Sequence, residues 1–280
     1  MTKYIGAHSS IAKGYDKSLE SIHNIGGNAV QIFLKSPRAN KEKELDEKTA
    51  KKTYECITNN DLYLIGHCSY LLNFAREYTQ DNWPIQSLIN DIIKINKLGG
   101  KGVVLHIGKY LDMSKEEALK NIHTNLSQVL NNTPKETPIL FENTAGQGTE
   151  IGFKFEELKQ IYDQFSQEHK NRIKFCLDTA HAFSAGYDIS NPQYNIFDEF
   201  DNIVGIENLE CVHFNDSKKE LNSRVDRHED LCYGLIGVEG LKNTAIKANQ
   251  RKIPLILETT EKNTSYEEQI KTIKDWINNK

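Results

Sequence analysis

The stretch "IKFCLD" (residues 173–178) shows the pattern that decides the fold, a run of β-forming apolar residues that ends in an acid. Seven similar runs occur along the chain: "YIGAH" (4–8), "AVQIFL" (29–34), "LYLIGH" (62–67), "KGVVLH" (101–106), "PILFEN" (138–143), "LECVHF" (209–214) and "IPLILE" (253–258). Their apolar residues are nearly continuous rather than alternating, which is typical of strands buried on both faces. We therefore predict eight buried strands.

The runs begin between 25 and 44 residues apart, about the length of one strand and one helix with their loops. The segments between them, such as "SLINDIIKINKLGG" (87–100) and "FKFEELKQIYDQF" (153–165), have the apolar spacing of helices. Eight strand–helix units predict an α/β fold, a closed (β/α)8 TIM barrel that residues 1–280 form as a single domain. A doubly wound open sheet is the alternative.

The composition is that of a globular protein, with 38% hydrophobic and 26% charged residues. No apolar run approaches the roughly 20 residues of a membrane span, and "MTKYIGAHSS" (1–10) lacks the features of a signal peptide. The five cysteines are scattered and contain no C-x-x-C pair, which argues against a disulfide framework or a cysteine metal site. We expect a protein of a reducing intracellular compartment without a membrane partner. The net charge of −4 argues against a broad basic surface for nucleic acid but leaves a local groove open.

Imidazoles and carboxylates stand where six consecutive strands are expected to end. They are His67, His106, Glu142, Asp178, His213 and Glu258. In a TIM barrel these carboxyl ends and the loops after them build the active site. Any one of these residues alone is more often structural. Together they form a charged cluster that is costly to bury unless cations neutralise it.

Three further candidate ligands follow in the loops. In "SRVDRHEDL" (223–231), Asp226 and His228 alternate in an expected extended segment, so their side chains point the same way. In "DTAH" (178–181), His181 is either a ligand or part of a helix that Asp178 or Thr179 caps. Nitrogen and oxygen ligands without thiolates favour zinc, with manganese open at one site. Nine candidates are enough for about three tetrahedral zinc ions.

Several longer motifs resemble those of one known family. They are "YIGAHSS" (4–10), "IFLKSPR" (32–38), "GHCSYLLN" (66–73), "FENTAGQG" (141–148), "CLDTAHAFSAGYD" (176–188), "VHFNDSK" (212–218), "SRVDRH" (223–228) and "LETT" (257–260). In this order they resemble the endonuclease IV family of apurinic/apyrimidinic endonucleases. The resemblance implies a (β/α)8 barrel with three zinc ions that cleaves duplex DNA on the 5′ side of abasic sites. The products would be a 3′-hydroxyl and a 5′-deoxyribose phosphate.

The resemblance also implies roles for individual residues. Three zinc sites would be formed by His67, His106 and Glu142; by Glu142, Asp178, His213 and Glu258; and by His181, Asp226 and His228. Glu142 and Glu258 would be catalytic and orient the attacking hydroxide. We further expect removal of 3′-blocking groups, and a monomer.

Residues expected to contact DNA follow the strands on the same rim. Arg38, Tyr70 and Leu71 match family residues that insert into the duplex, although without the family match loop packing is the simpler role for Tyr70 and Leu71. Basic loop residues that could contact phosphates are Lys35, Lys109, Arg224 and Arg227. The sequence departs from the family pattern at Cys68, at Ile107 and in the loop after His228, next to ligands but not at them. We expect His8 to support the site or the fold rather than to bind metal.

Three alternatives remain open from sequence. A metal-dependent sugar isomerase or epimerase would share the barrel and the carboxylates, but would need fewer ligands and no duplex-inserting loop. A non-catalytic lesion-binding protein would be expected to lose at least one ligand position. A lysine-based lyase would remain active after chelation of zinc.

Overall fold

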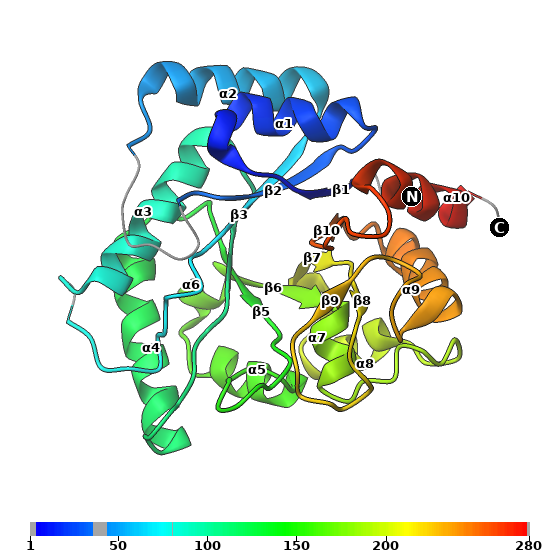
Figure 1. Ribbon diagram of the computed structural model, residues 1–280. Helices are drawn as coiled ribbons and strands as arrows, with labels where there is room; N and C mark the ends of the chain where they lie inside the picture. Colours follow the sequence, from blue (N-terminus) through cyan, green and yellow to red (C-terminus); the bar gives the residue numbers. More distant parts are fainter. Residues whose placement is uncertain (1–3, 36–43, 80, 279–280) are drawn as a thin grey trace.

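Eight parallel strands form a closed barrel in the computed structural model, which describes residues 4–35, 44–79 and 81–278 (Figure 1). Its strands are β1 (Ile5–His8), β2 (Ala29–Phe33), β3 (Tyr63–His67), β4 (Val103–Leu105), β5 (Ile139–Glu142), β6 (Ile173–Asp178), β7 (Leu209–His213) and β10 (Leu255–Leu257). Each strand pairs with the next along the chain, and β1 closes the ring by pairing with β10. The predicted TIM barrel is confirmed, and the open sheet is wrong.

Helices alternate with the strands and surround the barrel (Figure 1). They are α1 (Tyr15–Asn24), α2 (Glu47–Asn60), α3 (Trp83–Leu98), α4 (Lys115–Asn131), α5 (Phe155–Asp163), α6 (Gln167–Lys170), α7 (Thr179–Ser184), α8 (Ile196–Ile203), α9 (Gly237–Arg251) and α10 (Tyr266–Asn278), with short 3-10 turns η1 (Ile11–Lys13) and η2 (Ile206–Asn208). Local sequence sets their ends. The Asp46 side chain caps α2 by accepting a hydrogen bond from the Thr49 amide at 2.8 Å. Gly99 ends α3 in the left-handed conformation at φ 80°, which glycine adopts without strain.

An apolar layer fills the inside of the barrel. It consists of Ala29, Tyr63, Ile65, Val104, Leu140, Cys176, Cys211 and Ile256. Because side chains of a strand alternate between its two faces, the residue two places further along also points inward. On seven strands these next inward residues are Gln31, in the middle of β2, and His67, His106, Glu142, Asp178, His213 and Glu258, at or just after the strand ends. The two-residue alternation of side chains along the strands therefore places a polar layer directly above an apolar one.

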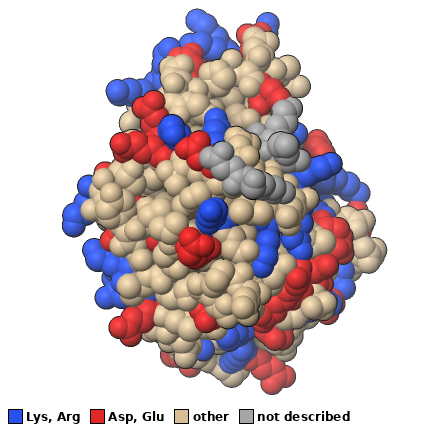
Figure 2. Space-filling model, turned by 90° about the vertical axis from the view of Figure 1, so that its right-hand side faces the viewer, with Lys and Arg blue, Asp and Glu red and all other residues tan. Residues whose placement is uncertain are grey.

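Charges are mixed on the side of the molecule that lies to the right in Figure 1. Figure 2 shows Lys and Arg side chains interspersed with Asp and Glu there, around uncharged patches. This side offers no broad basic surface, in line with the net charge of −4. None of the described helices combines the length and the apolar character that crossing a membrane requires.

Candidate metal centre

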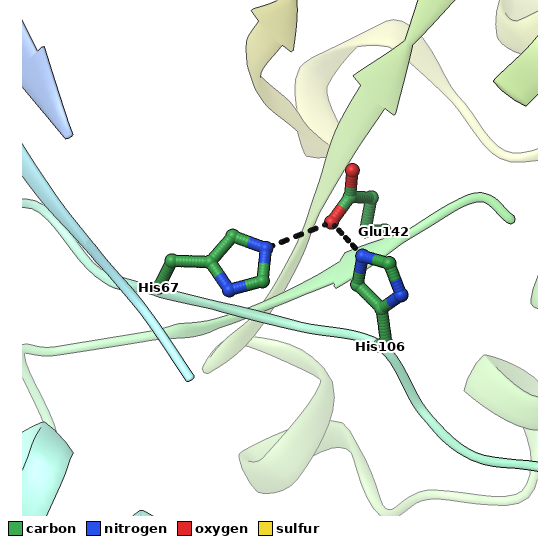
Figure 3. A group of neighbouring side chains, drawn as sticks. All are labelled: His67, His106 and Glu142. Atoms are coloured by element: carbon green, nitrogen blue, oxygen red, sulfur yellow. Dashed lines mark hydrogen bonds and ion pairs between the residues drawn. The ribbon is translucent and has the colours of Figure 1, made fainter. Parts of the chain in front are cut away.

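Glu142, the last residue of β5, lies at the centre of the polar layer and is completely buried. Its Oε2 atom lies 2.8 Å from His106 Nε2 and 3.3 Å from His67 Nε2, so both rings point at one oxygen (Figure 3). Its Oε1 atom lies 2.8 Å from His213 Nδ1. Burial alone would raise the pKa of Glu142, but His106 and His213 outweigh burial and hold it well below the usual range. The carboxylate is therefore ionised and surrounded by ring nitrogens.

Asp178 ends β6 and its side chain caps α7, so the helical reading of "DTAH" is confirmed, while a ligand role for His181 stays a prediction. Its Oδ1 caps the helix by accepting a hydrogen bond from the His181 amide at 2.7 Å. Its Oδ2 accepts one from Asn215 Nδ2 at 2.7 Å and lies 3.4 Å from His228 Nε2. The Asp178 carboxylate thus caps α7 with one oxygen and faces His228 with the other.

His181, Asp226 and His228 meet beside Asp178. Asp226 Oδ1 lies 3.3 Å from His181 Nε2 and 3.5 Å from His228 Nε2. The two-residue strands β8 (Asp216–Ser217) and β9 (His228–Glu229) pair antiparallel and position the segment that carries Asp226 and His228. Burial lowers the pKa of His181, but Asp178 and Asp226 outweigh burial and raise it well above its ordinary value.

Glu258 completes the cluster from the end of β10. Its Oε2 lies 3.0 Å from His213 Nδ1, the same ring atom that faces Glu142. Its Oε1 accepts a hydrogen bond from Gln31 Nε2, and its backbone amide donates to Asn215 Oδ1 at 2.8 Å. Gln31 and Asn215 are not among the site residues that the sequence predicts. The signal for Gln31 was an amide within the apolar run "AVQIFL".

Three groups of these side chains have donor atoms that all lie within 4.8 Å of one another. The groups are His67, His106 and Glu142; Glu142, Asp178, His213 and Glu258; and Asp178, His181 and His228. Glu142 belongs to two groups, as the resemblance implies. Asp178 also belongs to two, which the sequence-based division does not include. Asp226 reaches the third group through its contacts with both histidines.

A pocket of about 610 Å³ opens beside these groups. His106, Asp226 and His228 line it together with Tyr70 and Leu71, which are 52% and 49% exposed. The Tyr70 ring packs with its centroid 5.3 Å from that of His67 and 5.5 Å from that of His106. Two apolar side chains therefore stand next to the candidate ligands, with half of their surface free to contact another molecule.

The basic residues that were predicted to contact DNA lie in different surroundings. Lys109 and Arg227 line the pocket, and Lys109 pairs with Glu150 at 3.1 Å. The guanidinium of Arg224 lies 3.9 Å from the centre of the Phe153 ring, a cation–π contact. Arg38 lies outside the described residues.

Lys35 does not have the predicted place. It is 4% exposed, and its ammonium lies 3.1 Å from Asp91 Oδ1 and 2.6 Å from Ser87 Oγ on α3. The prediction of a phosphate contact is wrong for Lys35, because the chain directs this side chain between the barrel and α3 instead of toward the rim.

The departures from the family pattern lie beside the ligands, as expected. Cys68 is buried, and its carbonyl oxygen lies 2.8 Å from His67 Nδ1. Ile107 packs in the core. His8 packs edge-on against Phe33 at 4.9 Å, and burial lowers its pKa to about 4. These positions are compatible with supporting roles.

Comparisons with known proteins identify the family. A family model described as "Xylose isomerase-like TIM barrel" matches residues 19–279. "Putative endonuclease 4" of Acanthamoeba polyphaga mimivirus is 37% identical, over 99% of this chain and 94% of that protein. "Probable endonuclease 4" of Clostridium beijerinckii is 34% identical, over 98% of this chain and 99% of that protein. The crystal structure of endonuclease IV from Thermus thermophilus has a TM-score of 0.87 at 31% identity and covers 99% of this chain and 100% of that one. The chain belongs to the endonuclease IV family of TIM barrels and is a hydrolase of the endonuclease class.

Proposed function

We propose that this endonuclease is a zinc-dependent enzyme of DNA base excision repair. It hydrolyses the phosphodiester bond on the 5′ side of an abasic site in duplex DNA and leaves a 3′-hydroxyl and a 5′-deoxyribose phosphate. The observation that carries the proposal is the cluster of imidazoles and carboxylates around Glu142 and Asp178, beside a pocket with half-exposed apolar residues. Membership in the endonuclease IV family supports it.

The donor set fits zinc. His228 Nε2 is shielded from solvent and makes no hydrogen bond among the described residues, although two carboxylate oxygens lie 3.4 and 3.5 Å away. An imidazole nitrogen in that position suits a cation placed between it and the carboxylates. The ligands offer nitrogen and oxygen without thiolate, a combination that zinc accepts and that leaves manganese open at one site.

We assign three ions to the three groups. The first would be held by His67, His106 and Glu142; the second by Glu142, Asp178, His213 and Glu258; and the third by His181, Asp226 and His228, with Asp178 beside it. When bound, zinc lowers the pKa of a water molecule and stabilises negative charge on phosphate oxygens.

The side chains then orient the reaction. Glu142 and Glu258, whose oxygens Oε1 and Oε2 both lie near His213 Nδ1, would orient the attacking water beside the second group. Its oxygen bonds to phosphorus and its proton passes to one of these carboxylates, while the bond from phosphorus to the 3′-oxygen of the preceding nucleotide breaks. That oxygen takes up a proton and leaves as the 3′-hydroxyl, so no covalent enzyme intermediate forms. The same displacement would release groups that block a 3′ end.

Selectivity for an abasic site has two sources in the proposal. Extruding a nucleotide that has no base avoids most of the few kcal/mol that lost pairing and stacking ordinarily cost. Tyr70 and Leu71 can fill the space in the duplex, while Lys109 and Arg227 lie where a DNA backbone would approach the pocket. We also propose that residues 1–280 act as one domain and as a monomer.

The test combines cleavage with metal analysis on one sample. The protein is incubated with a duplex that contains a reduced abasic analogue, and bound zinc is measured per chain. Incision 5′ to the analogue by zinc-loaded protein, lost on chelation and restored by zinc, is the expected result. Reduced analogues block lyases, so incision also excludes a lysine-based mechanism. Zinc-loaded protein that leaves the analogue intact, or cuts an undamaged duplex equally, would overturn the proposal.

A further inference from the structure

Gln31 is a buried amide in the middle of the site. It lies on β2, is 0% exposed and points into the barrel. Its Oε1 accepts a hydrogen bond from His213 Nε2 at 2.7 Å, and its Nε2 donates to Glu258 Oε1. One side chain thus joins two proposed ligands that come from different strands.

The chemistry of the three groups fixes the orientation of the Gln31 amide and the proton on His213 Nε2. An ionised carboxylate only accepts hydrogen bonds, so the amide nitrogen of Gln31 must face Glu258 and its oxygen must face His213. An amide oxygen also only accepts, so Nε2 of His213 must carry a proton. The remaining ring atom, Nδ1, lies 2.8 Å from Glu142 Oε1 and 3.0 Å from Glu258 Oε2. It is the ring atom directed at the proposed metal position.

The position of Gln31 among the inward-facing residues independently supports a role in the site. Seven strands present an inward side chain directly above the apolar layer, and six of these side chains are proposed ligands. Gln31 occupies the seventh position. An apolar residue there would suit the layer below, but it would leave His213 Nε2 and Glu258 Oε1 without their present partner.

We propose that Gln31 is a positioning residue that fixes His213 in the Nε2-protonated tautomer and orients Glu258 toward the same metal position. This rests on the proposed function, because it assigns the shared point to a metal ion. Partners of this kind typically change metal affinity or activity by about 10- to 100-fold when they are removed.

Two substitutions separate the contacts. Gln31→Met has a similar volume and makes neither hydrogen bond. Gln31→Glu keeps an acceptor for His213 but loses the donor to Glu258. Asn208→Leu is the matched control, since Asn208 is a buried amide just before β7, at the opposite end of the strand that carries His213. It tests whether the loss of a buried amide elsewhere is sufficient to change zinc binding or activity.

Three readouts are needed: zinc affinity by competition with a chromophoric chelator, kcat and KM on the reduced abasic duplex, and histidine ring ¹⁵N–¹H spectra of the zinc-loaded protein. For Gln31→Met we expect about 10- to 100-fold weaker binding of one zinc ion and a similar fall in kcat. KM should stay unchanged, and the Nε2–H signal of His213 should be lost or shifted. Gln31→Glu should retain that signal but lose activity. Asn208→Leu should change none of the three.

The outcomes distinguish the inference from the proposed function. If wild-type protein binds zinc and cleaves the duplex, but Gln31→Met matches it in zinc affinity, kcat and the His213 spectrum, the role of Gln31 is wrong and the function stands. If wild-type protein neither binds zinc nor cleaves, the function itself fails. Equal losses in Asn208→Leu and Gln31→Met would show a general effect on folding and would also overturn the role of Gln31.

Discussion

Replacing Tyr70 with alanine tests whether the pocket wall recognises the lesion. The ring is 52% exposed and lines the pocket beside the candidate metal ligands. A tyrosine can bury about 200 Å² in a contact, so about 100 Å² of this side chain remains for DNA to cover. At about 25 cal/mol per Å², and allowing for the alanine that remains, the loss of binding free energy is about 2 kcal/mol. This corresponds to an approximately 30-fold higher Kd for abasic duplex.

The assay is equilibrium binding of zinc-loaded protein to a labelled duplex with one reduced abasic analogue, in a buffer that prevents turnover. Tyr70→Phe keeps the ring and should bind like wild type. Tyr54→Ala is the matched control, because Tyr54 is 53% exposed but lies on α2. Bound zinc is measured in every variant, since Tyr70 also packs on His67 and His106. Unchanged affinity in Tyr70→Ala, or an equal loss in Tyr54→Ala, would refute the reasoning.

Three further predictions address the site and its surroundings. Glu258→Gln should keep its affinity for abasic DNA but lose at least about 100-fold in kcat, because an amide is a poor proton acceptor; near-normal turnover in a single-turnover assay would contradict this. Asp178→Ala should lose more than one zinc per chain and His181→Ala about one, because Asp178 contacts two groups; equal loss by metal analysis would argue against sharing. Lys35→Met should lower the free energy of unfolding, measured in urea, by about 3 to 5 kcal/mol, because it breaks a buried ion pair with Asp91. Weaker DNA binding at unchanged stability would instead support the original prediction that Lys35 contacts a phosphate.

The strands and most candidate ligands could be predicted because their signals are local. Apolar runs at regular spacing predicted the eight strands, and each run ends within about one residue of the observed strand. Glu142 and Asp178 stand at those ends, and parallel strands in a barrel bring their carboxyl ends to one rim. Residue type and strand direction were therefore sufficient to predict one shared polar rim.

Lys35 and Gln31 show what local signals leave open. Both lie in or just after β2, and the sequence suggested a rim contact for the lysine and an apolar strand around the glutamine. Lys35 instead pairs with Asp91 on α3, because the path of the chain after the strand decides whether a side chain faces the rim or the helices. Gln31 acquires its role from His213 and Glu258, which lie 182 and 227 residues away along the chain.

The sequence by itself determined the barrel, the polar rim and the chemical type of its ligands, because these depend on hydrophobic spacing and strand period within short segments. Only the tertiary structure decided which candidate ligands come together in one group, as with Asp178 in two groups, and which side chains contact them. Those features depend on distances across the barrel. Such distances are set by how the strands pack around a common centre, and no spacing along the chain records them.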